Sequence, residues 1–213
     1  MNSLFNLDNP VMRFLSKVFD VMYLSVLWGL FSLPIITIGA STTAMYYTTV
    51  KVIRRERGYV FQEFWKSFKV NLVQSTLAWI LVMIGGALFA TNVMFAKNLD
   101  SQFGMVLEAV YIVMCAMVLG TGMYIFPVMS RFTMKLFPLI KTCSFLLLKY
   151  FPRSLVLAAI TAASVFFIYL QPIMSFFVPV CGTLLFSLMM EPILKKYTPH
   201  ANEGDNRDEW YLE

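Results

Sequence analysis

Long apolar runs separated by short charged segments make up most of this chain of 213 residues. A helix of about 20 apolar residues is long enough to cross the hydrocarbon core of a bilayer. Four runs of roughly this length extend over residues 70–96, 105–129, 154–170 and 173–194. The last two are joined only by Gln171 and Pro172, as in a helical hairpin. The pattern predicts an all-α, polytopic membrane helix bundle.

The first apolar run is too long for one untilted helix. It covers the 33 residues from Val18 to Val50, and Asp20 is its single charged residue. Pro34 removes a backbone donor, and Gly39 tolerates conformations that other residues avoid, so we expect the chain to turn between these two residues. Pro34 and Gly39 are therefore candidate structural residues.

Two interpretations of this run are open. In the first, a span over residues 18–33 is followed by a turn and by a short helix that returns over residues 41–57, which gives six spans in all. In the second, one span covers residues 18–40 and the following helix lies flat on the membrane surface, which gives five. Surface helices carry basic residues along their whole polar face, but residues 41–50 contain none. The charge placement favours the hairpin, in which Lys51 and the arginines after it reach to the interface.

The distribution of lysine and arginine predicts the orientation. With six spans, 16 of the 17 basic residues lie on one side of the membrane, and Lys97 lies on the other. With five spans, Arg13 and Lys17 move across and the division becomes 14 to 3. Basic residues are enriched on the cytoplasmic side. We therefore expect six spans in the cell membrane, with both termini in the cytoplasm.

A charged segment and an aromatic segment follow the first hairpin. Cations favour the last turn of a helix and glycine favours its stop, so the arginines and Gly58 indicate a helix end. Residues 59–75 then combine aromatic and charged side chains at helical spacing, which predicts an amphipathic helix on the cytoplasmic face. Its aromatic face is either an interfacial anchor or a docking surface. The candidate partner surface comprises Arg54, Arg55, Arg57, Gly58, Phe61, Phe64, Trp65 and Phe68.

A second basic segment covers residues 131–153, with five basic residues and no acidic one. It predicts another amphipathic helix on the cytoplasmic face, broken near Pro138. Attraction to anionic lipid headgroups, worth about 1 kcal/mol for each basic residue near the surface, is sufficient to explain this charge.

Composition and motifs exclude most soluble and catalytic classes. Hydrophobic residues make up 59% of the chain and charged residues only 14%, whereas soluble domains carry about a quarter charged residues. The acidic residues Asp20, Glu108 and Glu191 lie near span ends, where water or a basic neighbour can satisfy them. The single histidine, His200, lies in a polar tail, and the chain has no phosphate-binding P-loop. We expect no enzyme activity, cofactor, metal site or nucleic-acid partner.

The three cysteines and the absence of a linker bear on the domain organisation. Cys115, Cys143 and Cys181 lie in apolar sequence without paired spacing, so they are expected to be buried and unpaired. Residues 1–198 are expected to form a single integral membrane domain, and residues 199–213 a polar cytoplasmic tail.

Residues 33–75 resemble the signature region of the YesL family, which are small integral membrane proteins of Gram-positive bacteria. The resemblance rests on Pro34, Thr37, Gly39, Ala40, Tyr46, Gly58, Phe61, Phe64 and Phe68. Genes of that family often lie beside those of oligosaccharide ABC transporters and polysaccharide-degrading enzymes. The resemblance implies an accessory or scaffolding component of carbohydrate uptake, with ABC permease subunits as its partners.

Two further classes of function remain as alternatives. A self-contained small transporter requires a polar cavity between helices, and the intramembrane polar residues are few, chiefly Asn71, Gln74, Thr76, Thr91 and Asn92. A membrane sensor requires a sizeable outer part, whereas both predicted outer loops are short. Neither basic segment carries the EAA-type pattern of a pore-forming permease subunit, which favours an accessory role.

Overall fold

The computed structural model describes residues 10–99 and 102–197, and within these ranges the chain contains helices and no strand. Long runs of mostly apolar residues explain the helices, and short loops and turns connect them. In chain order the elements are α1 (Pro10–Ser32), the 3-10 turn η1 (Ile35–Thr37), α2 (Ile38–Thr48), the π-helix η2 (Thr49–Arg54), α3 (Val60–Lys97), α4 (Gln102–Arg131), α5 (Leu136–Lys149), α6 (Phe151–Leu170), the 3-10 turn η3 (Pro172–Phe176) and α7 (Val178–Tyr197).

Five of these helices are long and apolar enough to cross a membrane. They are α1 from Phe14 onward, α3, α4, α6 and α7. The predictions of an all-helical fold and of a chain with several membrane-spanning helices are confirmed at this level. With 11 residues, α2 is too short to count among them.

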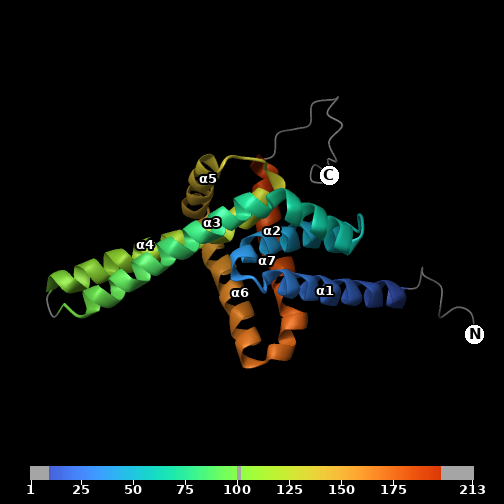
Figure 1. Ribbon diagram of the computed structural model, residues 1–213, viewed down its shortest axis with the longest axis horizontal. Coiled ribbons are helices and arrows are strands. Elements are labelled where there is room, and N and C mark those ends of the chain that lie inside the picture. The colour runs from blue at the N-terminus through green and yellow to red at the C-terminus, as the bar shows by residue number, and fades with distance from the viewer. Residues whose placement is uncertain (1–9, 100–101, 198–213) are drawn as a thin grey trace, which may run out of the picture.

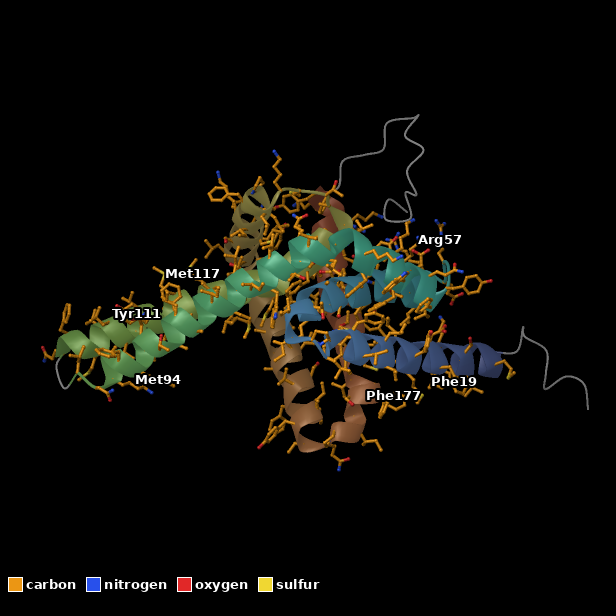
Figure 2. All side chains as sticks on the ribbon, viewed as in Figure 1. Phe19, Arg57, Met94, Tyr111, Met117 and Phe177 are labelled. Atoms are coloured by element: carbon orange, nitrogen blue, oxygen red, sulfur yellow. The ribbon has the colours of Figure 1, made fainter. Side chains whose placement is uncertain are left out.

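Two helical hairpins and α1 meet around α2, which lies at the centre of the molecule (Figure 1). The pair α3 and α4 forms the longest hairpin, α6 and α7 form a second hairpin that points in another direction, and α1 runs beside α2. Met94 and Tyr111 mark the far part of the α3/α4 hairpin, whereas Arg57 lies at the opposite end of α3 (Figure 2). The central position of α2 leaves it almost completely buried.

A tight turn connects α1 to α2. Pro34 has an extended backbone, and the Thr37 hydroxyl donates hydrogen bonds to the carbonyl oxygens of Phe31 at 2.7 Å and Pro34 at 2.8 Å. The indole N–H of Trp28 donates to Thr42 Oγ1 at 3.3 Å, which ties α2 to α1. The chain therefore reverses within a few residues of Pro34.

The helix α3 differs from the expectation of a surface helix followed by a separate span. It is continuous over the 38 residues from Val60 to Lys97, a length of about 57 Å. Composition changes along this segment, but no proline interrupts it and its first glycine is Gly85, so the helical backbone has no reason to break.

The predicted helix break near Pro138 is also displaced. The chain leaves helical geometry after Arg131, and α5 begins at Leu136, so Pro138 lies in the first turn of α5. Proline is tolerated there because the first turn of a helix has no partners for its N–H groups. The break therefore precedes Pro138.

The cysteines are all free thiols, but only Cys143 is fully buried; Cys115 is half-buried and Cys181 is exposed. Cys143 packs among the apolar residues between α4 and α5, where burial raises the pKa of its thiol to about 12. The prediction of three buried cysteines is wrong for Cys181, because that position faces away from the helices around it.

Candidate functional site

A very close approach of α2 to α3 surrounds Gly39. A Cβ atom at this position would lie 2.5 Å from the carbonyl oxygen of Ser75 and 2.8 Å from Cβ of Trp79. One turn further along α2, the hydroxyls of Thr43 and Ser75 lie 3.0 Å apart. Glycine at position 39 is therefore required for this contact rather than for the turn that precedes it.

Charged and phenolic groups from distant parts of the chain meet around Glu191 in α7. Nη2 of Arg131, at the end of α4, donates to Glu191 Oε2 at 2.9 Å. Tyr46 of α2 donates its hydroxyl hydrogen to Glu191 Oε1 at 3.1 Å, and Arg55 lies 3.9 Å from the same carboxylate. The Arg131 side chain is only 2% exposed. We call Tyr46, Arg55, Arg131 and Glu191 the Glu191 cluster.

A second ion pair and a further arginine contact lie on the same part of α2 and η2. Lys51 in the π-helix lies 2.9 Å from Glu63 of α3, and its ammonium donates to the hydroxyl of Tyr47 at 3.2 Å. Nη1 of Arg54 donates to the carbonyl and the hydroxyl of Ser187 in α7, both at 3.2 Å. Lys51, expected to reach toward the interface, is instead buried in the protein. These basic side chains join helices.

The helix ends at Arg54, which is earlier than the predicted stop at Gly58. Glu56 and Gly58 both adopt positive φ angles, of 55° and 85°. At Gly58 the left-handed conformation favours glycine because it has no Cβ. Arg57 is exposed beside this turn, and Figure 2 places its side chain at the end of the molecule where α3 begins.

The aromatic residues of α3 divide into a buried and an exposed set. Phe64 and Phe68 are buried, and their ring centroids lie 5.6 and 5.1 Å from that of Phe31 in α1. Trp65 is half-buried against the same ring, at 5.5 Å, whereas Phe61 is 47% exposed. The surface offered to a partner is thus narrower than expected, because Phe64 and Phe68 belong to the core.

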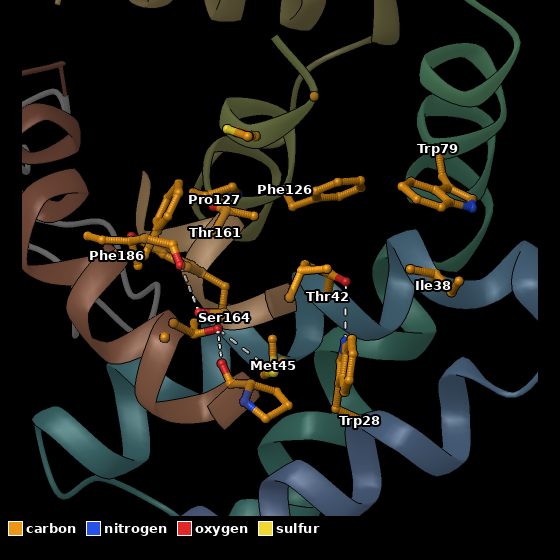
Figure 3. A pocket seen from close by; sticks show the side chains of 18 of the residues that line it. Trp28, Ile38, Thr42, Met45, Trp79, Phe126, Pro127, Thr161, Ser164 and Phe186 are labelled. Atoms are coloured by element: carbon orange, nitrogen blue, oxygen red, sulfur yellow. Dashed lines mark hydrogen bonds between the residues drawn. The ribbon is translucent and has the colours of Figure 1, made fainter. Parts of the chain in front are cut away.

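An apolar cavity of about 460 Å³ lies among α1, α2 and the two hairpins (Figure 3). Trp28, Thr42, Trp79 and Phe126 are among the side chains around it, which come from α1, α2, α3, α4, α6 and α7. None of the described residues that line it is charged. Tyr46 lines one side of the cavity and belongs to the Glu191 cluster as well.

Three of the hydroxyl groups in this cavity donate to carbonyl oxygens of their own helices. Thr161 donates to the carbonyl oxygen of Leu157 at 2.9 Å, and Ser164 donates to that of Ile160 at 2.8 Å. Thr183 makes the same bond to Pro179, at 2.8 Å. A sugar needs several polar partners, since buried polar groups must be hydrogen-bonded. The cavity offers few.

Sequence reasoning missed the Glu191 cluster. Opposite charges near the ends of different spans were the available signal, but nothing local in the sequence specifies which of them meet. Among the described residues, no group of three or more His, Cys, Asp or Glu side chains is arranged to hold a metal ion.

These features define a multi-pass membrane protein whose buried charges pair between helices. Residues 21–93 match a family model described as a protein of unknown function, DUF624. The match covers the second half of α1, all of α2 and η2, and nearly all of α3, and it includes every candidate residue from Pro34 to Phe68. No curated protein and no solved structure matches the chain.

Proposed function

We propose that this chain is an accessory or scaffolding component that assembles with a carbohydrate ABC-type uptake system in the cell membrane and is not itself an enzyme. The observation that carries the proposal is the use of the buried charges. Arg131 pairs with Glu191, and Lys51 pairs with Glu63, and each pair connects two different helical elements. Charges used in this way stabilise one arrangement of the bundle and are not presented to a substrate.

The resemblance of residues 33–75 to the YesL family supports the choice of partner. The region at residues 21–93 that matches the DUF624 model contains the same stretch. A DUF624 match is consistent with membership of the YesL family. The association of YesL genes with oligosaccharide ABC transporters in Gram-positive bacteria then suggests the kind of system that this chain serves.

A self-contained transporter or a membrane sensor is the alternative. An oligosaccharide would have to pass through or bind in a polar cavity, whereas the cavity between the helices has an apolar lining, and the hydroxyls of Thr161 and Ser164 are bonded to their own helix. Uptake of oligosaccharide by proteoliposomes that contain the purified chain alone would support the transporter and contradict the accessory role.

The same proposal includes a topology of six spans with both termini in the cytoplasm. In it, α2 and η2 together form the returning half of the first hairpin, with 17 residues from Ile38 to Arg54 and a length of about 25 Å. This is shorter than a hydrocarbon core of about 30 Å. The burial of α2 by its neighbours removes the need for direct contact with lipid along its whole length.

A cysteine at Asn6 in a variant without the native cysteines tests this topology. We expect it to react with a membrane-impermeant maleimide only after the cells are opened, because the six-span arrangement places the amino terminus inside. Labelling in intact cells would refute the six-span hairpin and leave the five-span arrangement.

The exposed part of the aromatic segment provides a test of the partner. We expect the detergent-solubilised chain to co-purify with a carbohydrate ABC permease, and the pair Phe61→Ala with Trp65→Ala to reduce this recovery severalfold, because Phe61 and part of Trp65 are accessible. Quantitative mass spectrometry of the purified material measures the recovery.

Two controls separate docking from stability. Phe61→Ala alone changes an exposed ring and leaves the contact between Trp65 and Phe31 in place. Phe95→Ala removes an exposed ring at the far end of the same helix and should leave recovery unchanged. Equal recovery for all the variants would exclude this surface, and a list of partners without any transporter component would contradict the proposed function.

A further inference from the structure

The helix α5 carries apolar residues on two opposite faces. Leu139, Cys143, Leu146 and Leu147 are buried in the core that α4 and α6 share. On the opposite side Phe137, Phe145 and Leu148 are 84%, 54% and 60% exposed. Large apolar side chains gathered on one exposed face mark an interaction site. One face of α5 is covered by the protein core, and we expect another apolar environment to cover the exposed face.

Lysines are interleaved with these exposed rings. Positions 137, 141, 145 and 148 are three or four residues apart, so Lys141 lies on the same strip of the helix as the apolar residues. Lys149 follows at the end of the strip. Further exposed cations lie at the adjoining ends of neighbouring elements, namely Lys135, Arg153, Lys195 and Lys196, and residues 132–153 contain no acidic side chain.

Contacts at the end of α5 hold part of this positive charge in place. Nζ of Lys149 donates to the hydroxyl of Tyr197, at the end of α7, at 2.7 Å. The same ammonium lies 5.3 Å from the ring centroid of Phe145 and 5.9 Å from that of Tyr150. The ends of α5 and α7 are thus linked, and one surface of the protein presents both rings and ammonium groups.

The place of α5 in the chain specifies the medium that covers this surface. With 14 residues, α5 is about 21 Å long and too short to cross a bilayer. It follows the candidate span α4 and directly precedes the candidate span α6 (Figure 1). We therefore expect its exposed face to lie within reach of lipid headgroups. Interfacial helices of this kind insert their apolar residues at the headgroup boundary and extend their lysines to phosphate.

We propose that the exposed face of α5, formed by Phe137, Lys141, Phe145, Leu148 and Lys149, is a binding surface for anionic phospholipids. The rings enter the boundary between headgroups and acyl chains, and the lysines bind lipid phosphate. A nucleic acid or an acidic protein segment would match the charge but would leave Phe137 and Leu148 without an apolar contact. This inference rests on the membrane class of the chain and does not depend on a transporter partner.

Fluorescence quenching by brominated lipids tests the surface directly. Phe145→Trp places a reporter on α5, and its emission is obtained by difference from the parent chain in vesicles of matched composition. We expect brominated phosphatidylglycerol to quench this emission more strongly than the same fraction of brominated phosphatidylcholine. Lys141→Gln and Lys149→Gln each remove one lysine. Each substitution alone should lower the preference for the anionic lipid by about fivefold.

Matched variants keep the result interpretable. Lys66→Gln with Lys69→Gln removes the same charge from α3 and should preserve the preference. Lys141→Gln alone leaves the hydrogen bond between Lys149 and Tyr197 in place, so a loss of preference in that variant cannot come from a disturbed α7. Equal quenching by the two lipids, or no quenching by either, would overturn the proposal. Failure to co-purify a permease would not affect this measurement.

Discussion

Replacement of Arg131 by methionine is expected to lower the free energy of unfolding by about 3–5 kcal/mol, because it leaves the Glu191 carboxylate buried without its closest cation. The two side chains are 2% and 10% exposed, and their charged atoms lie 2.9 Å apart. Arg55 is 3.9 Å from the carboxylate, which is too far for a direct hydrogen bond. Thermal unfolding of the detergent-solubilised protein, followed by size-exclusion chromatography at each temperature, measures the change.

The double variant Arg131→Met with Glu191→Gln provides the control. It removes both charges of the pair, so no carboxylate is left buried without its cation. We expect it to recover most of the stability lost in Arg131→Met. If the single variant is as stable as the parent chain, the Glu191 cluster does not hold the helices together, and the main support for the accessory role is lost.

Gly39→Ala is expected to destabilise the chain by about 1–3 kcal/mol, although alanine is ordinarily the better residue within a helix. The new methyl group would lie 2.5 Å from the backbone carbonyl oxygen of Ser75. A carbonyl within α3 cannot move away without breaking helical hydrogen bonds, so α2 must shift. The same thermal assay measures the loss.

Gly29 is the matched control for this substitution. It also lies within an apolar helix, but a Cβ atom built there meets nothing within 4 Å. We expect Gly29→Ala to be neutral or to stabilise the chain by up to about 1 kcal/mol through helix propensity. Equal effects at the two glycines would show that the contact between α2 and α3 is looser than the structure indicates.

Local chemistry accounts for the parts of the fold that could be predicted. Apolar runs of sufficient length give helices, and the basic residues with Gly58 indicated a helix end nearby, although η2 already ends at Arg54. The continuous course of α3 was harder to predict, because the change from mixed to apolar composition near Val70 resembles a boundary although the helical backbone continues through it. Composition and backbone geometry need not change at the same residue.

The candidate site depends on contacts that no local pattern contains. Arg131 and Glu191 are 60 residues apart, and Tyr46 and Glu191 are 145 apart. In the sequence, each of these three side chains has several plausible partners near the ends of other spans. The burial of Phe64 and Phe68 was also hidden, because an aromatic helical face looks the same in sequence whether it faces α1 or a partner. In both cases tertiary packing selects the contact.

The position of Glu191 has a consequence for biosynthesis. Chains emerge from the ribosome amino terminus first, so Arg54, Arg55 and Arg131 are all synthesised before the acidic residue and the serine that bind them in α7. Until α7 is in place, Arg55, which lies in the segment matched by the family model, cannot contact Glu191. The centre of the bundle can therefore reach its final charge balance only when α7 has been inserted.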